Sequence, residues 1–212
     1  MNKINILGIG PGSRDYILNI TEKKIKEADV LIGGQRALDL FADFNKKTLK
    51  ITANLSKIRD YIKDNCRKEK IAVLVSGDPG LYSFLAYLKK YFPREDLEVI
   101  PGISAMQLAF ARATMVWQDA KILSLHGKDN KEYLLKMLKK YEKVGFFTDY
   151  KFPPAEIAKY LLENNIKGRR AIIFEDLSYP DEKIIDKSLE ELSEVETGNL
   201  TVMVIYNENL EF

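Results

Sequence analysis

Apolar runs alternate with amphipathic stretches along the first half of the chain, and this alternation predicts strands separated by helices. The strands are apolar on both faces, which is typical of a parallel sheet that helices cover on both sides. Thr21 is placed to cap the first helix. The predicted strands are 3–9, 30–34, 48–52, 70–77 and 97–102, and the predicted helices are 21–29, 54–69, 81–91 and 103–112.

A second series of elements follows the looser segment 113–119. No helix separates two of its strands, 169–176 and 183–188, so we expect this sheet to be mixed. The pattern predicts an α/β fold with two domains, residues 1–114 and residues 115–212, each of about 100 residues. The other predicted strands here are 120–127, 144–149 and 199–206, and the predicted helices are 131–142 and 154–165.

Composition narrows the class of protein. Lys plus Arg number 33 and Asp plus Glu number 31, a balance that argues against a general nucleic-acid or membrane-surface binder. The single cysteine, Cys66, excludes an internal disulfide, and the single histidine, His126, excludes a multi-histidine metal site. No apolar run approaches the roughly 20 residues that span a bilayer. We therefore expect a soluble cytoplasmic protein without a protein-bound metal.

Glycine-rich turns follow three of the predicted parallel strands, with GIGPGS at 8–13, SGDPGLY at 76–82 and PGISA at 101–105. Carboxyl ends of parallel strands meet at one sheet edge, where open α/β sheets bind ligands, so we expect these turns to line a cleft. The first turn is not the dinucleotide fingerprint, because Ser13 replaces its third glycine and the second strand ends in glycine instead of an acid. The alternative is that the glycines only serve tight turns.

Together with IGGQR (32–36), WQDAKILSLHG (117–127) and LSYPDEKI (177–184), these motifs resemble the tetrapyrrole methylases, in particular the branch that methylates C5 of a precorrin or cobalt-precorrin. The resemblance covers essentially the whole chain. It implies two α/β domains with S-adenosylmethionine in a cleft between them, a tetrapyrrole substrate and a homodimer. Ser13 departs from the Asp that many members carry, so no carboxylate is expected in the first turn.

The resemblance also implies which residues contact the donor. Gly77 and Asp78 would hold its methionine portion, while Leu81 and Tyr82 would form a wall. Asp78 and Ser104 have an alternative role as helix N-caps. The full predicted donor set is Gly77, Asp78, Leu81, Tyr82, Ser104, Ala105, Thr148, Asn199 and Leu200.

The acceptor side of the predicted site draws on the first glycine turn. By the resemblance, Gly10, Pro11 and Gly12 would form the floor of the tetrapyrrole site. Arg36 would meet one of the substrate carboxylates, which guanidinium groups bind with two hydrogen bonds. The alternative for Arg36 is a surface salt bridge.

Candidate catalytic residues end successive strands of the second domain. His126 precedes a glycine and would bond a substrate carboxylate or assist proton loss, with a structural histidine as the alternative. Asp149, next to Thr148, ends the following strand, and Glu175 and Asp176 end a third. Few ionisable groups are needed, because methyl transfer from a sulfonium is a direct displacement that depends on alignment.

Two rival functions share parts of this pattern. A diphthine synthase-like enzyme has the same fold and donor but modifies a protein histidine, and a binding module would have no activity. The intact SGDPGLY and PGISA motifs argue against an inactive module, and IGGQR and SLHG favour the corrin branch. Since 212 residues leave no room for a second methyltransferase, we expect a separate C15-methyltransferase and decarboxylase as a partner.

Overall fold

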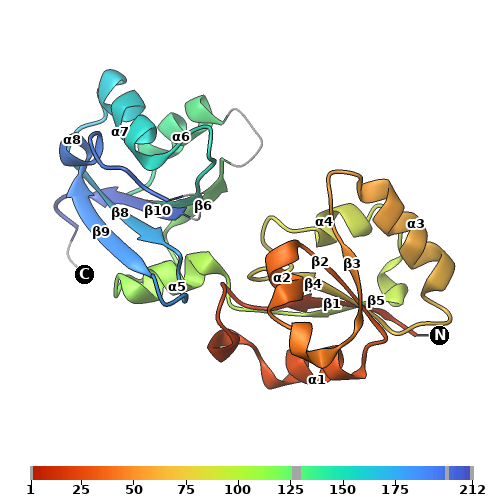
Figure 1. Cartoon of the computed structure of the whole chain (residues 1–212). Helices are drawn as coiled ribbons and strands as arrows, with labels where there is room; N and C mark the ends of the chain where they lie inside the picture. Colours follow the sequence, from red (N-terminus) through yellow and green to blue (C-terminus); the bar gives the residue numbers. More distant parts are fainter. Residues whose placement is uncertain (1, 126–129, 199–200, 211–212) are drawn as a thin grey trace. The chain divides into compact units, whose positions relative to one another are not determined.

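The chain forms two compact units, Met1–Ser104 and Ala105–Phe212, each an α/β layer structure (Figure 1). This computed structural model describes residues 2–125, 130–198 and 201–210. The sequence predicts a domain boundary between residues 114 and 115, whereas the two units divide between Ser104 and Ala105. The helix α5 (Ala105–Arg112) therefore belongs with the second unit.

The first unit is built on a five-stranded sheet in the order β3-β2-β4-β1-β5. Every neighbouring pair in it is parallel, as the apolar runs predict. β1, the first strand of the chain, lies between β4 and β5. The strands are β1 (Ile4–Gly8), β2 (Val30–Gly33), β3 (Lys47–Lys50), β4 (Ile71–Val75) and β5 (Leu97–Ile100).

Helices cover both faces of this sheet, which explains why its central strands β1, β2 and β4 are apolar on both sides. Ile6 and Val73 pack into the cluster beneath α3 (Leu55–Asn65) and α4 (Leu85–Leu88). Leu7 and its neighbours pack on the opposite face against α1 (Asn19–Glu27) and α2 (Gln35–Asp39). The 3-10 turns are η1 (Arg14–Tyr16), η2 (Ala42–Phe44) and η3 (Arg94–Asp96).

Two local predictions in this unit are wrong. The helix predicted at 81–91 is reduced to α4, because Tyr82 has a left-handed backbone with φ of 48° that an α-helix cannot include. Thr21 does not cap α1, which begins two residues earlier. Its buried hydroxyl instead donates to the carbonyl of Gly8 at 3.3 Å.

The second unit contains a five-stranded mixed sheet in the order β6-β7-β10-β8-β9. Only β6 and β7 are parallel, so the prediction of a mixed sheet is confirmed. β10, the last strand in the chain, pairs with both β7 and β8. The strands are β6 (Lys121–Ser124), β7 (Lys143–Phe147), β8 (Arg169–Glu175), β9 (Lys183–Ser188) and β10 (Thr201–Asn207).

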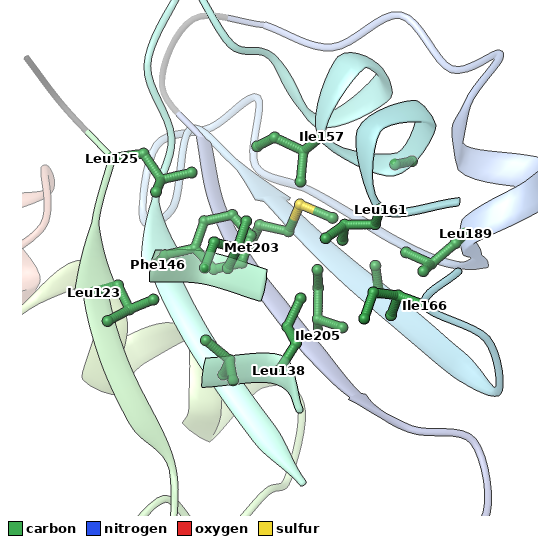
Figure 2. Close-up of a cluster of buried hydrophobic side chains, with 14 of the residues drawn as sticks. Leu123, Leu125, Leu138, Phe146, Ile157, Leu161, Ile166, Leu189, Met203 and Ile205 are labelled. Carbon is green, nitrogen blue, oxygen red and sulfur yellow. The ribbon is translucent and has the colours of Figure 1, made fainter. Parts of the chain in front are cut away.

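One face of this sheet packs against α6 (Lys131–Leu138), α7 (Pro154–Glu163) and α8 (Leu189–Leu192) in a continuous apolar core, with Phe146 and Met203 at its centre (Figure 2). α5 covers the other face. A methyl group on Gly145 would lie 2.6 Å from the sulfur of Met106, so the glycine allows α5 to approach β7 closely.

Thr114 ends α5 in a left-handed conformation with φ of 55°. The N–H of Met115 donates to the carbonyl of Phe110 at 2.9 Å, which is the hydrogen bond of a Schellman motif. A β-branched residue is strained at this position, where glycine is preferred. We expect Thr114→Gly to raise the free energy of unfolding by about 1 kcal/mol, measured by urea denaturation. Thr114 is exposed, so the substitution removes no buried contact. An unchanged or lower free energy of unfolding would show that the backbone of Thr114 is not strained.

Among the described residues, no helix combines the length and the apolar character that a membrane span requires. Within the same residues, no three histidine, cysteine, aspartate or glutamate side chains group together in a way that would hold a metal ion.

Candidate functional site

The three glycine turns lie side by side at the carboxyl edge of the first sheet. Their strands, β4, β1 and β5, are direct neighbours, with Gly8 opposite Val75 and Leu7 opposite Ile100 in the register. The expectation that the turns share one sheet edge is therefore confirmed. We call this set, residues 8–12, 76–82 and 101–104, the glycine edge.

The glycines of this edge pack against one another. A methyl group on Gly8 would lie 2.5 Å from the amide nitrogen of Gly102, and one on Gly102 would lie 2.4 Å from the carbonyl oxygen of Gly77. Real side chains do not make contacts this short with backbone atoms. The close packing of three backbone segments is therefore sufficient to require glycine at these positions, without a bound ligand.

Gly10 joins the first two turns. It accepts a hydrogen bond from the N–H of Gly77 at 2.8 Å and has a φ of 77°, which favours glycine. Its backbone also lies against Tyr16, where a methyl group would be 3.0 Å from the carbonyl oxygen. Of the predicted acceptor floor, Gly10 and Gly12 are buried and Pro11 is half-buried.

Asp78 ties the second turn to the third. One carboxylate oxygen accepts the N–H of Gly80 at 2.6 Å, and the other accepts the N–H of Gly102 at 3.1 Å. The alternative role as the N-cap of a helix from residue 81 is wrong, because α4 begins only at Leu85. The half-buried carboxylate keeps acceptor capacity beyond these two bonds, since an ionised carboxyl offers about four lone-pair positions.

The segment after Asp78 is a tight, braced loop. The N–H of Leu81 donates to the carbonyl of Asp78 at 3.1 Å, and the hydroxyl of Ser83 donates to the carbonyl of Pro79. The same hydroxyl accepts the N–H of Leu85 at 3.1 Å. Within this loop Leu81 is half-buried, whereas Tyr82 is 59% exposed.

An arginine holds the first turn in place, and sequence reasoning missed it. Arg14 donates from Nε to the carbonyl of Leu40 at 2.8 Å and from both terminal nitrogens to Asp43, whose pKa this hydrogen bonding lowers. Its guanidinium lies over the rings of Phe41 and Phe44, at 5.3 and 5.4 Å. No local motif marks this contact, because its two sides are far apart in sequence.

Arg36 lies at the start of α2, directly after the carboxyl end of β2. It is exposed, and its side chain makes no hydrogen bond or ion pair with the part of the chain that the structure describes. The surface salt bridge considered for Arg36 is therefore not formed within those residues. The guanidinium is available to an anionic ligand.

Among the described residues of the second unit, the strand ends that carry Thr148 and Glu175 lie at one sheet edge. The register places Phe147, the last residue of β7, opposite Ser124 and Val202, and Thr201 opposite Glu175. Thr148 donates from its hydroxyl to the carbonyl of Thr201 at 3.0 Å. Glu175 is 6% exposed and accepts the N–H of Gly198 at 2.6 Å.

Asp149 accepts the N–H of Lys151 at 2.9 Å in a turn closed by Phe152. Ser104 is buried and directly precedes Ala105, the first residue of α5. Three predicted site residues, His126, Asn199 and Leu200, lie outside the described residues.

The loop after β8 is fixed by a contact that the sequence did not indicate. Arg112, at the end of α5, donates to Glu182 at 2.6 Å, and Glu182 also accepts the N–H of Ser178 at 2.6 Å. These hydrogen bonds lower the pKa of the Glu182 carboxyl, with the Arg112 contribution the largest. The pair joins residues 70 positions apart, so no local pattern could have revealed it.

Known proteins resemble this chain over most of its length. Residues 3–193 match the sequence profile of the tetrapyrrole (corrin/porphyrin) methylases. A probable cobalt-precorrin-7 C(5)-methyltransferase of Methanocaldococcus jannaschii is 39% identical, over 95% of this chain and 96% of its own. A cobalt-precorrin-7 C(5)-methyltransferase of Salmonella typhimurium is 32% identical, over 85% of this chain and 88% of its own.

Solved structures share the fold at low sequence identity. A cobalamin biosynthesis precorrin-6Y methylase from Archaeoglobus fulgidus has a TM-score of 0.74 at 20% identity, covering 98% of this chain and 99% of its own. A uroporphyrin-III C-methyltransferase from Thermus thermophilus, complexed with S-adenosylhomocysteine, has a TM-score of 0.77 at 18% identity, covering 97% of both chains. A diphthine synthase has a TM-score of 0.79 at 17% identity, covering 99% of this chain and 92% of its own.

Proposed function

Because this chain belongs to the tetrapyrrole (corrin/porphyrin) methylase family, we propose that it is an S-adenosylmethionine-dependent methyltransferase that methylates C5 of cobalt-precorrin-7 in cobalamin biosynthesis. The observation that carries this proposal is the 39% identity to a probable enzyme of that activity over nearly the whole length of both chains. The likeness to diphthine synthase concerns the fold alone and does not favour a protein acceptor.

The residues of the glycine edge fit the proposed donor. The carboxylate of Asp78 has acceptor capacity left after its two backbone bonds and would accept from the ammonium of the methionine portion. Gly77 places no side chain at this edge, and half-buried Leu81 offers apolar surface. Support for the donor also comes from the solved relative that holds S-adenosylhomocysteine.

When bound, S-adenosylmethionine supplies an electrophilic methyl group. The chain's own task is to hold donor and acceptor in line, which can contribute about 7–11 kcal/mol of a barrier. The braced turns suit this task, because Asp78 and Arg14 fix their backbones with side-chain hydrogen bonds. Apolar groups such as Leu81 would exclude water, which favours a reaction that disperses the charge of its donor.

On the acceptor side we propose that Gly10, Pro11 and Gly12 form the floor of the tetrapyrrole site and that Arg36 binds a substrate carboxylate. Arg36 is suited to this role because it is exposed and not paired with the described residues. In the second unit, Thr148 remains a proposed donor contact. So do Ala105, Asn199 and Leu200, and Ser104 at the end of the first unit.

His126 is the proposed proton acceptor or carboxylate ligand, and Asp149 the residue that assists it. His126 comes two residues after the end of β6 in the sequence. We expect His126→Ala to lower kcat at least about tenfold while the Kd for S-adenosylmethionine changes less than twofold. Steady-state kinetics and calorimetry measure the two quantities. An unchanged kcat with reduced stability would identify His126 as a structural residue.

The test of the proposed function is the mass of the product. The chain, incubated with S-adenosylmethionine and purified cobalt-precorrin-7, is expected to add one methyl group and to release no carbon dioxide. A displacement needs only an aligned donor and an electron-rich carbon, whereas decarboxylation needs a further site that stabilises the remaining electrons. A product that also lacks a carboxyl group would contradict this assignment, and no product with folded protein would remove the proposed activity.

Three further properties belong to the same proposal. We infer a cytoplasmic location, a homodimer, and a separate enzyme for methylation and decarboxylation at C15. Light scattering of the purified chain tests the homodimer, and a monomer at micromolar concentration would contradict it.

A further inference from the structure

Tyr82 is held in a backbone conformation that its side chain disfavours. Its φ of 48° lies in the left-handed region, which costs a residue other than glycine about 1–2 kcal/mol. Five other non-glycine residues in the described part of the chain share this feature, and the three that are Asn or Asp tolerate it well. Among the six, Tyr82 has the only aromatic ring, so its conformation calls for a separate explanation.

The surrounding loop imposes this conformation. Hydrogen bonds from Gly80 to the Asp78 carboxylate, from Leu81 to the Asp78 carbonyl and from Leu85 to Ser83 brace both sides of Tyr82. Glycine or asparagine would satisfy the same path at lower cost. Burial repays little of that cost, because Tyr82 is 59% exposed.

Such strain persists in proteins where function requires it. From this combination of strain, bracing and exposure on the glycine edge, we propose that Tyr82 presents its ring to the acceptor, where it stacks on the flat tetrapyrrole macrocycle and helps to select it. This inference rests on the proposed function and adds the acceptor contact that selects a conjugated macrocycle. Offset stacking on an extended conjugated system uses a broad exposed ring face of this kind.

The acceptor explains the exposure of Tyr82 better than the donor wall that the sequence predicts. A sulfonium is attracted to an aromatic face, but that attraction becomes strong only when the ring is desolvated. Half-buried Leu81 is the better wall residue. Variants of Tyr82 distinguish the two roles. Loss of a donor wall would weaken the binding of S-adenosylmethionine, whereas loss of a stacking ring would weaken the binding of the macrocycle.

The decisive variants are Tyr82→Asn, which relieves the strain and removes the ring, and Tyr82→Phe, which keeps the ring. Tyr82→Asn is expected to raise Tm by about 2–4 °C. It is also expected to raise both the Kd and the KM for cobalt-precorrin-7 about tenfold, as for one lost stacking contact. Tyr82→Phe should leave both constants within about threefold of the wild type. The control is Thr114→Gly, which relieves the same kind of strain in the second unit and should raise Tm without a change in either constant.

The affinity for the donor shows whether the ring of Tyr82 contacts the macrocycle or the donor. We expect the Kd values for S-adenosylmethionine and S-adenosylhomocysteine to stay within twofold in Tyr82→Asn, as measured by calorimetry. Weaker binding of S-adenosylmethionine alone would assign the ring to the sulfonium and overturn the inference. Lower stability with unchanged Kd and KM for the macrocycle would make Tyr82 structural and would overturn it as well.

Failure of the proposed function has a different signature. If the wild type binds cobalt-precorrin-7 in an absorbance titration but does not methylate it, the proposed function fails, and the Kd of the variants still decides the role of Tyr82. If the wild type binds no tetrapyrrole, the inference is overturned with it.

Discussion

Gly102→Ala is expected to lower the free energy of unfolding by more than about 3 kcal/mol. The new methyl group would lie 2.4 Å from the carbonyl oxygen of Gly77 and 2.8 Å from backbone atoms of Gly8. All of these neighbours are backbone atoms of other turns, so no side-chain rotation relieves the overlap. The turns after β1, β4 and β5 would have to separate, with loss of the hydrogen bond between Gly102 and Asp78. Urea denaturation followed by circular dichroism measures the change.

Gly34→Ala is the matched control. A methyl group at Gly34 has no atom within 4 Å, and its φ of −66° suits any residue. Its effect is expected to be neutral or stabilising by up to about 1 kcal/mol, because alanine reduces the entropy of the unfolded chain. Equal stability of the Gly102 and Gly34 variants would show that the three turns do not meet as described.

Asp78→Ala is expected to lower both stability and donor affinity. Two backbone N–H groups, of Gly80 and Gly102, lose their charged acceptor, at a cost of about 2–4 kcal/mol in total. We expect the Kd for S-adenosylmethionine to rise at least about tenfold, because the proposed contact with the donor ammonium disappears and the turn loosens. Denaturation and calorimetry on the folded variant measure the two effects.

Asp78→Asn removes the negative charge but can keep one of the two backbone hydrogen bonds. Its amide oxygen can replace only one carboxylate oxygen, since the amide nitrogen donates and leaves one N–H without an acceptor. Asp60→Asn, which removes an exposed carboxylate paired with its neighbour Arg59, serves as the control and should change stability by less than about 0.5 kcal/mol. If the Asp78 variants lose stability but bind the donor as tightly as the wild type, Asp78 has only a structural role.

The layout of the first sheet could be predicted because its signal is local. The central strands β1, β2 and β4 are apolar runs, and parallel strands place their carboxyl ends together whatever their order. The glycine edge follows from those two facts. The mutual packing of Gly8, Gly77 and Gly102 could not be predicted, since it depends on β1 lying between β4 and β5.

The local errors have equally physical causes. The apolar spacing after residue 81 is helical, but the hydrogen bonds of the Asp78 turn override it and force Tyr82 out of the helical region. Threonine is a common helix N-cap, but the hydroxyl of Thr21 donates a hydrogen bond to the carbonyl of Gly8 instead. Arg14 and Arg112 bind partners far away in the sequence, which a single sequence does not reveal.

The position of β10 has a consequence for the order in which the chain can acquire its structure during synthesis. β10 pairs with both β7 and β8, so the middle of the second sheet is missing until the last strand has been made. All strands of the first unit, by contrast, lie before residue 101. On the ribosome the first unit can therefore fold while the second is still being translated. During that interval β7 and β8 have edges without a partner, which makes the nascent second unit the part most in need of protection from aggregation.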